Sequence, residues 1–203
     1  MSAPASALRA DAQRNRRLLL EAAAHEFATR GIDVSASEIA ARAGVAKGTL
    51  FRHFPTKSEL VCAVLIDRMA LVRAIAIEIA GTRTPGLAAV GELMSRGAEV
   101  IAADRSFFDA AMAAVVPSES LRAAKRAFEA ALDALVEAAQ SAGEVRRDVR
   151  GIDLAMLMMA ATNTTAPTQE RHPELWRRYL ALMVDGLRPG ATTPLVVAAA
   201  SGD

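Results

Sequence analysis

Four side chains that can carry a positive charge fall within one short stretch of the chain: Lys47, Arg52, His53 and Lys57. Cationic groups at this density bind anions through charge-assisted hydrogen bonds, and a nucleic-acid backbone offers phosphates in a row. The charge is local, because residues 1–57 hold 9 Lys and Arg against 5 Asp and Glu, whereas the remaining residues hold 15 against 18. The net charge of +1 therefore conceals a basic N-terminal quarter that favours a polyanionic partner.

The sequence lacks the residue patterns of metal sites, disulfide frameworks, phosphate loops and catalytic sets. The three histidines form no His-x-x-x-His pair, and the single cysteine, Cys62, excludes an internal disulfide framework and a multi-cysteine metal site. Cys62 is expected to be a small apolar residue on a helix, with a redox sensor as the alternative. The run GVAKGT lacks the spacing of a phosphate loop, and no Glu-x-x-His or Ser-His-Asp set occurs. We expect no catalytic residue, no metal and no cofactor, and so no enzyme.

The cationic stretch lies among short helical patterns that meet at a glycine. Apolar residues recur with helical spacing over residues 11–30, and Gly31 ends that pattern. Ser35 and Glu38 form a capping box that opens a second helix, which Gly44 closes after less than three turns. Another brief helix is expected over Gly48–Phe54. Residues 11–54 therefore hold three helices, two of them unusually short.

Two short helices joined at a glycine indicate a helix-turn-helix. The turn requires a residue that tolerates positive φ, which Gly44 supplies, and the close helix crossing requires a small residue, which is Ala40. Three apolar residues can close the small core: Ile39, Val45 and Leu50. The later helix of this motif, over about Gly48–Phe54, would enter a DNA major groove. Three residues are expected on its solvent side: Lys47, Thr49 and Arg52.

The rest of the chain is also predicted to be helical. Thr56 and Glu59 form a second capping box that opens a long helix through about Ala80, and further patterns cover 85–104, 107–117, 118–140, 152–166 and 172–188. We predict an all-α protein of about nine helices, with a disordered arm (1–10), a three-helix unit (11–57), a helical bundle (58–188) and a flexible tail (189–203). The sequence has no signal-peptide pattern and no bilayer-length apolar run, so we expect a cytoplasmic protein without a membrane partner.

The run AARAGVAKGTLFRHFPTKSEL resembles the N-terminal domain of TetR-type transcriptional regulators. Their pattern is an A-x-x-x-G turn, a G-T-L-Y/F-x-H/Y-F recognition helix and a K-x-x-L that opens the fourth helix. The resemblance covers roughly residues 14–65, and the remainder agrees in length, helix order and the run GEVRRDVRGIDLAML before the eighth helix. It implies a ligand-responsive DNA-binding regulator, usually a repressor. Such a regulator binds a palindromic operator as a homodimer, and a small-molecule effector releases it.

The resemblance also implies roles for single residues of the DNA-binding domain. The positions that meet bases or phosphates are Ser35, Ser37, Lys47, Gly48, Thr49, Phe51, Arg52, His53 and Lys57. Two positions depart from the family pattern. Phe51 replaces the usual tyrosine, which leaves only stacking or thymine-methyl contact, and Ala46 replaces the serine that commonly caps the recognition helix.

In the C-terminal domain, apolar residues are expected to serve the effector pocket and the dimer interface that the resemblance implies. The residues expected at the pocket are Met69, Phe107, Phe108, Met112 and Asn163. Those expected at the dimer interface, on the last two helices, are Leu154, Met158, Leu175, Tyr179 and Met183. Ordinary core packing remains the alternative for both sets. The alternative function is a helical interaction module without specific DNA binding.

Overall fold

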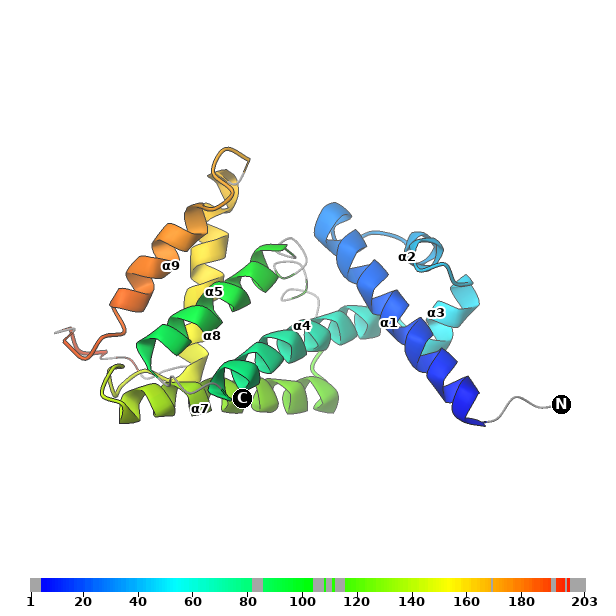
Figure 1. Ribbon diagram of the computed structural model, residues 1–203. Helices are drawn as coiled ribbons and strands as arrows, with labels where there is room; N and C mark the ends of the chain where they lie inside the picture. The colour runs from blue at the N-terminus through cyan, green and yellow to red at the C-terminus, as the bar shows by residue number, and fades with distance from the viewer. Residues whose placement is uncertain are drawn as a thin grey trace. The chain divides into compact units, whose positions relative to one another are not determined.

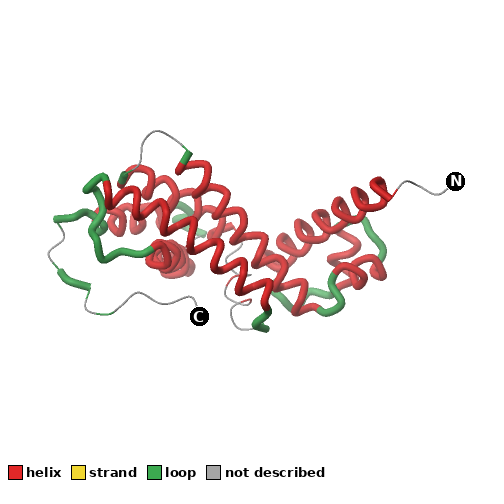
Figure 2. Tube along the Cα trace, turned by 90° about the horizontal axis from the view of Figure 1, so that it is seen from below, coloured by secondary structure: helices red, strands yellow, loops and turns green. Residues whose placement is uncertain are grey.

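The computed structural model describes residues 5–81, 86–103, 108, 111, 116–168, 170–190, 193–195 and 197, and within these it contains helices and no strand (Figure 2). The helices are α1 (Ala5–Arg30), α2 (Ala36–Arg42), α3 (Lys47–His53), α4 (Lys57–Ala80), α5 (Leu87–Ala103), α7 (Glu119–Ser141), α8 (Gly151–Thr165), the 3₁₀ turn η1 (Ala166–Thr168) and α9 (Leu175–Asp185). The prediction of an all-α fold is confirmed. The helix expected over 107–117 lies largely outside the described residues.

The chain divides into two compact units, and the division falls within α4. The first unit comprises Met1–Asp67 with Asp104–Pro117, and the second comprises Arg68–Ala103 with Ser118–Asp203. The boundary lies later than the expected one after residue 57, because the first turns of α4 bury Leu60, Val61 and Val64. α4 therefore contributes residues to both units.

The first helix begins earlier than the sequence analysis predicted. α1 starts at Ala5, so residues 5–10 are helical and the expected disordered arm over 1–10 is wrong for them. The physical reason is composition, because this segment holds Ala, Leu and Arg, which are among the best helix formers. The far end agrees with expectation: Gly31 follows the helix with φ +77°, and its N–H donates to the Phe27 carbonyl at 3.0 Å.

The second unit is built around α8, which packs against α5, α7 and α9 (Figure 1). A helix with neighbours on three sides must be apolar on most of its surface, and the run LAMLMMAAT in α8 meets that requirement. The largest side chains of this unit with less than 2 % exposure are Leu93, Met94, Leu132, Leu154 and Met158, and Trp176 is buried at 6 % exposure.

Polar side chains of α7 and of the loop after it bind backbone groups at the first turns of α5 and α8 and within the loop. The Glu144 carboxylate accepts a hydrogen bond from the Leu87 N–H at 3.0 Å, at the first turn of α5. The Asp133 carboxylate accepts one from the Gly151 N–H at 2.7 Å, at the first turn of α8. The Gln140 side chain donates to two loop carbonyls at 2.9 Å. Glu144 belongs to the run GEVRRDVRGID of the sequence, and this contact accounts for one of the polar residues of that run.

Across the described helices, none combines the length and the apolar character that crossing a membrane would require.

Candidate nucleic-acid interface

The first short helix of the basic region, α2, is held at its start by the predicted capping box. The Glu38 N–H donates to the Ser35 hydroxyl at 3.3 Å, and the Ser35 N–H donates to the Glu38 carboxylate at 2.9 Å. The Ser35 hydroxyl is therefore already engaged in the cap. Ser37 is exposed on the first turn of α2.

The turn between α2 and α3 has the predicted geometry. Gly44 adopts φ +67°, a conformation that residues with a Cβ rarely take. The Val45 N–H donates to the Ala40 carbonyl at 3.0 Å, which folds the chain back onto the end of α2. Ile39, Ala40 and Leu50 are buried where the two helices pack, whereas Val45 is only half-buried.

The candidate recognition helix α3 has one buried side and one exposed side. Leu50 is its buried residue, and Phe54 at its C-terminal cap is also buried. Lys47, Gly48, Phe51 and Arg52 are exposed, and Thr49 is half-buried. Ala46, at the N-cap, makes no side-chain hydrogen bond, so the serine-type cap is absent as expected.

Side chains on the solvent side of α3 contact one another in two pairs. The Lys47 ammonium lies 5.9 Å from the ring centroid of Phe51, which is 41 % exposed, and the Arg52 guanidinium donates to the Thr49 hydroxyl at 3.3 Å. α3 therefore presents two cations, a hydroxyl and an aromatic ring together. These groups suit guanine oxygens, phosphates and thymine methyl groups.

The remaining predicted phosphate contacts lie at the junction of α3 and α4. His53 is half-buried in the last turn of α3, and its ring centroid lies 6.3 Å from that of Phe54. Lys57 is exposed at the first residue of α4, whose N–H groups favour anions nearby. Thr56 caps this helix by accepting from the Glu59 N–H at 3.1 Å, while the Glu59 carboxylate accepts from the Thr56 hydroxyl.

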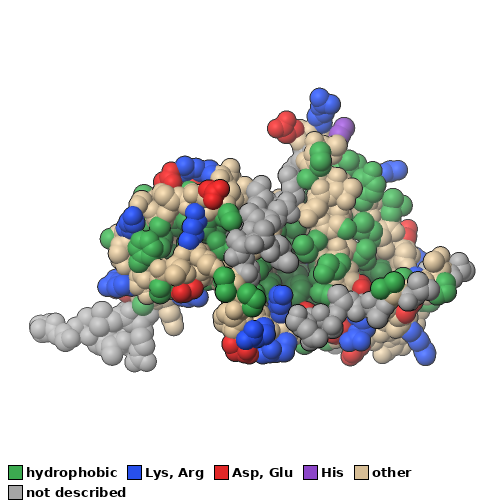
Figure 3. All heavy atoms as spheres, turned by 180° about the vertical axis from the view of Figure 1, so that it is seen from behind, with side chains coloured by type: hydrophobic (Ala, Val, Ile, Leu, Met, Phe, Trp, Pro, Cys, Tyr) green, Lys and Arg blue, Asp and Glu red, His purple; other side chains and the backbone are tan. Residues whose placement is uncertain are grey.

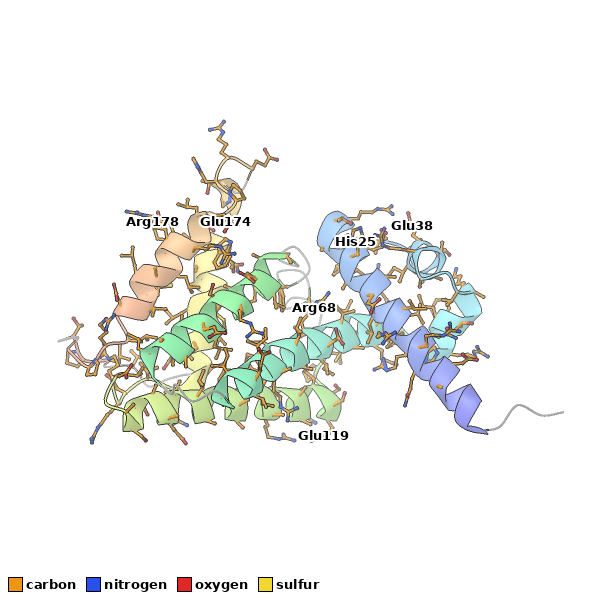
Figure 4. All side chains as sticks on the ribbon, in the orientation of Figure 1. His25, Glu38, Arg68, Glu119, Glu174 and Arg178 are labelled. Atoms are coloured by element: carbon orange, nitrogen blue, oxygen red, sulfur yellow. The ribbon has the colours of Figure 1, made fainter. Side chains whose placement is uncertain are left out.

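An ion-pair network that the sequence analysis missed braces α1 against α2. The Glu26 carboxylate accepts from Arg30 and from Arg42, each at 3.2 Å, and a second bond joins Arg30 to Glu38. Figure 4 shows Glu38 on α2 near the C-terminal end of α1. The only local signal was Arg30 four residues after Glu26, which also lies beside the buried Phe27.

The network shifts the pKa values of its exposed members, Glu38 and Arg30. The Ser35 side chain, the Ser35 backbone N–H and the Arg30 guanidinium together lower the pKa of Glu38 from 4.5 to about 2. The hydrogen bond from Arg30 to Glu38 raises the pKa of Arg30 in turn. Glu38 is therefore charged, and α2 capped, at any pH near neutrality.

Of the residues expected at the effector pocket, three lie among the described residues. Met69, Phe108 and Asn163 are half-buried, and Phe107 and Met112 lie outside the described residues. Two cavities of the second unit have volumes of about 420 and 330 Å³, and none of these three described residues lines them. Those cavities lie instead along the loop after α7 and between the ends of α8 and α9.

Two residues expected at the dimer interface are inside the protomer. Leu154 and Met158 are 0 % and 1 % exposed, so neither has surface left for a second chain, and that expectation is wrong for both. The reason is the central place of α8, which turns these two residues toward its neighbours. Leu175 and Met183 are half-buried and Tyr179 is exposed. Met156 and Leu182, outside that expected set, are large, apolar and exposed on α8 and α9.

The chain matches family models over most of its length. Residues 19–64 match the model described as bacterial regulatory proteins of the tetR family, and residues 84–189 match that of the transcriptional regulator SbtR-like C-terminal domain. The first match contains α2 and α3, and the second contains α5, α7, α8 and α9.

Solved structures give the same assignment. A TetR transcription regulatory protein from Mycobacterium vanbaalenii is 37 % identical, with a TM-score of 0.67 over 89 % of this chain and 99 % of that one. A TetR transcriptional regulator from Streptomyces coelicolor is 30 % identical, with a TM-score of 0.65 over 87 % and 99 %. FadR from Bacillus subtilis, solved in complex with stearoyl-CoA, is 15 % identical and shares the fold, with a TM-score of 0.67 over 87 % and 99 %. The chain therefore belongs to the TetR family of bacterial transcriptional regulators, with α2 and α3 as its DNA-binding helix-turn-helix.

Proposed function

We propose that this regulator is a repressor that binds a palindromic operator as a homodimer and leaves it when a small molecule binds the second unit. The observation that carries the proposal is the division of α3, which buries Leu50 and exposes Lys47, Phe51 and Arg52. A helix with this division can enter a major groove while its apolar side stays on the domain.

The contacts to DNA divide by chemistry. Lys47, Thr49 and Arg52 lie on α3 and have the donors that read base edges, and the Phe51 ring suits a thymine methyl group. Three residues at helix ends suit phosphates: Ser37 at the start of α2, His53 at the end of α3 and Lys57 at the start of α4. Contacts with phosphates fix the register of the protein on DNA without reading its sequence. Gly48 faces open space, since nothing lies within 4 Å of the place of a Cβ. Because glycine has no side chain, the backbone of α3 can approach the DNA closely there.

Dimerisation is proposed through α8 and α9. Three large apolar side chains on these helices are exposed: Met156, Tyr179 and Leu182. Figure 3 shows hydrophobic side chains gathered on one face of the second unit, with charged side chains around its margin. A contiguous apolar surface with a polar rim is the usual form of an interface between identical chains.

The effector is proposed to act through α4, which contributes residues to both units. Of the described candidates for its site, Met69 on α4 and Asn163 on α8 belong to the second unit. A small molecule releases DNA only if it binds the DNA-incompetent arrangement more tightly, since equal affinity for both arrangements shifts nothing. The stearoyl-CoA held by FadR makes acyl-CoA esters a reasonable first class of compounds to screen.

The proposal is tested by fluorescence anisotropy with a labelled duplex from the DNA upstream of the protein's own gene, against a scrambled duplex. We expect a preference of about 10³ or more for the native duplex, with two chains bound per site. Lys57→Ala should weaken binding to both duplexes alike, whereas Lys47→Ala and Arg52→Ala should also reduce the preference. Equal losses on both duplexes from all three variants would contradict the division of roles. Absence of binding at low salt would favour an interaction module instead.

A further inference from the structure

An arginine of α1 is held at the C-terminal end of the recognition helix. The guanidinium carbon of Arg16 lies 4.8 Å from the ring centroid of Phe54, the residue that caps α3. The Phe54 N–H donates to the Leu50 carbonyl at 2.8 Å, so the ring is fixed to the last turn of α3. His53 and Lys57, both proposed phosphate contacts, flank Phe54 in the sequence.

Arg16 differs from the neighbouring cations of the first unit in lacking an acidic partner. Arg14 pairs with Asp11 at 3.2 Å, and Arg17 pairs with Glu21 at 3.7 Å. Arg30 and Arg42 both pair with Glu26. Among the residues that the structure describes, the partner of Arg16 is the Phe54 ring alone. A contact with a ring uses none of the five N–H donors of a guanidinium, so the exposed Arg16 keeps all of them.

A purely structural role would need only the alkyl part of Arg16. Phe54 is 3 % exposed, and the stem of a long side chain can cover such a ring while its end reaches water. Leucine or methionine would cover the ring equally well. A guanidinium at this place also puts an uncompensated positive charge beside the helix that enters the DNA groove, where phosphates border the protein.

We propose that Arg16 binds a DNA phosphate and that Phe54 positions it, which extends the DNA interface from α3 and the start of α4 onto α1. The inference rests on the proposed DNA-binding function. Each protomer would neutralise one further phosphate through Arg16, and the planar guanidinium can donate two parallel hydrogen bonds to that group. Because phosphates are present at every base pair, the contact strengthens binding without changing sequence preference.

The test measures the salt dependence of DNA binding by the full chain. Wild type, Arg16→Gln and Arg17→Gln are titrated onto a mixed-sequence duplex by fluorescence anisotropy, over about 50 to 200 mM salt. Arg17→Gln is the matched control, because it removes the same charge one residue away on the same helix. We expect Arg16→Gln to weaken binding about five- to tenfold and to flatten the slope of log K against log salt by about 0.9 for each protomer bound. Arg17→Gln should leave both quantities near those of wild type.

A second variant separates charge from ring coverage. Arg16→Met keeps an apolar stem over Phe54 and should unfold at the temperature of wild type while losing the same affinity and slope as Arg16→Gln. Arg16→Lys should retain the slope and recover part of the affinity, since an ammonium keeps the charge without the paired donors. An unchanged slope in both Arg16→Gln and Arg16→Met, or an equal change in Arg17→Gln, would overturn the proposal. If wild type itself binds no duplex at low salt, the proposed DNA-binding function fails first and this inference falls with it.

Discussion

The Glu26 carboxylate on α1 lies 3.2 Å from the Arg42 guanidinium on α2, and this pair joins two helices of the DNA-binding unit. Glu26 is 7 % exposed, whereas Arg42 and the other partner, Arg30, remain largely open to solvent. A buried carboxylate is tolerated here because each of its oxygens accepts from a guanidinium. The orientation of α2, and with it α3, therefore depends partly on a residue outside the helix-turn-helix.

Replacing Glu26 separates the ion pairs from the space they fill. Glu26→Ala should lower the free energy of unfolding by about 1–2 kcal/mol, because it removes both pairs and leaves a gap. Glu26→Leu should stay within about 1 kcal/mol of wild type, since an apolar residue of similar volume can replace a buried ion pair without net loss. Urea unfolding followed by circular dichroism measures both. A Leu variant as unstable as the Ala variant would show that the charges themselves hold α1 to α2.

The uncapped start of α3 can be improved by one hydroxyl. Ala46 has extended backbone angles of φ −67° and ψ 145°, which suit a capping serine, and it makes no side-chain hydrogen bond. Ala46→Ser should therefore raise the free energy of unfolding by about 1 kcal/mol, as a hydroxyl acceptor is supplied to the first turn. Ala41→Ser, at an exposed site within α2, is the control and should bring a small loss. No gain over that control in urea unfolding would argue that water already satisfies these N–H groups.

Replacing Gly48 by alanine should raise the stability of the protein and lower its affinity for DNA. It lies inside α3 with no atom within 4 Å of an added Cβ, so Gly48→Ala should stabilise the protein by up to about 1 kcal/mol. The same Cβ would separate the α3 backbone from DNA, so the affinity for the native duplex should fall. Thermal unfolding and anisotropy titration on one preparation give both values. A variant that gains stability and keeps full affinity would remove Gly48 from the proposed interface.

The crossing of α7 and α8 depends on Gly151. A Cβ added there would lie 2.6 Å from the Asp133 backbone nitrogen and 2.8 Å from the Leu132 Cβ, so α8 would have to move. Gly151→Ala should lower the free energy of unfolding by about 1–3 kcal/mol. Gly91→Ala on α5 is the matched control, because its nearest contact would be an ordinary 3.6 Å to Val184. The control should be neutral or slightly stabilising in the same urea titration, and equal losses from both would contradict a special role for the crossing.

Acid should weaken the DNA-binding unit through Glu38. The folded pKa of about 2 lies below the ordinary 4.5, so Glu38 stabilises the folded state fully above about pH 4.5. That contribution is lost as the pH falls toward 2, because the unfolded chain then binds a proton that the folded chain excludes. The urea midpoint should fall over this window, and Glu38→Gln should show a shallower fall. Identical pH profiles for the two proteins would contradict the capping and pairing of Glu38.

Local sequence signals predicted the helix-turn-helix because its parts depend on residues close together in the chain. The Ser35–Glu38 box and the positive φ of Gly44 are both observed as predicted. Burial was harder to predict, as Leu154 and Met158 show, because an apolar pattern does not say which neighbour covers it. The prediction for the start of α1 was wrong for a different reason. Small and polar residues suggest a disordered arm over 1–10, but residues 5–10 also favour a helix and form one.

The sequence by itself therefore determined the helical class, the family resemblance and the separation of the exposed Lys47 and Arg52 of α3 from its buried Leu50. Only the tertiary structure decided the partners of side chains from separate helices. Glu26 meets Arg42 because α1 packs against α2, Arg16 of α1 reaches Phe54 at the end of α3, and Glu144 meets Leu87 because the loop after α7 reaches the start of α5. The physical reason is range: caps and turns are set within about four residues, whereas the crossing of two helices is set by the packing of whole apolar faces.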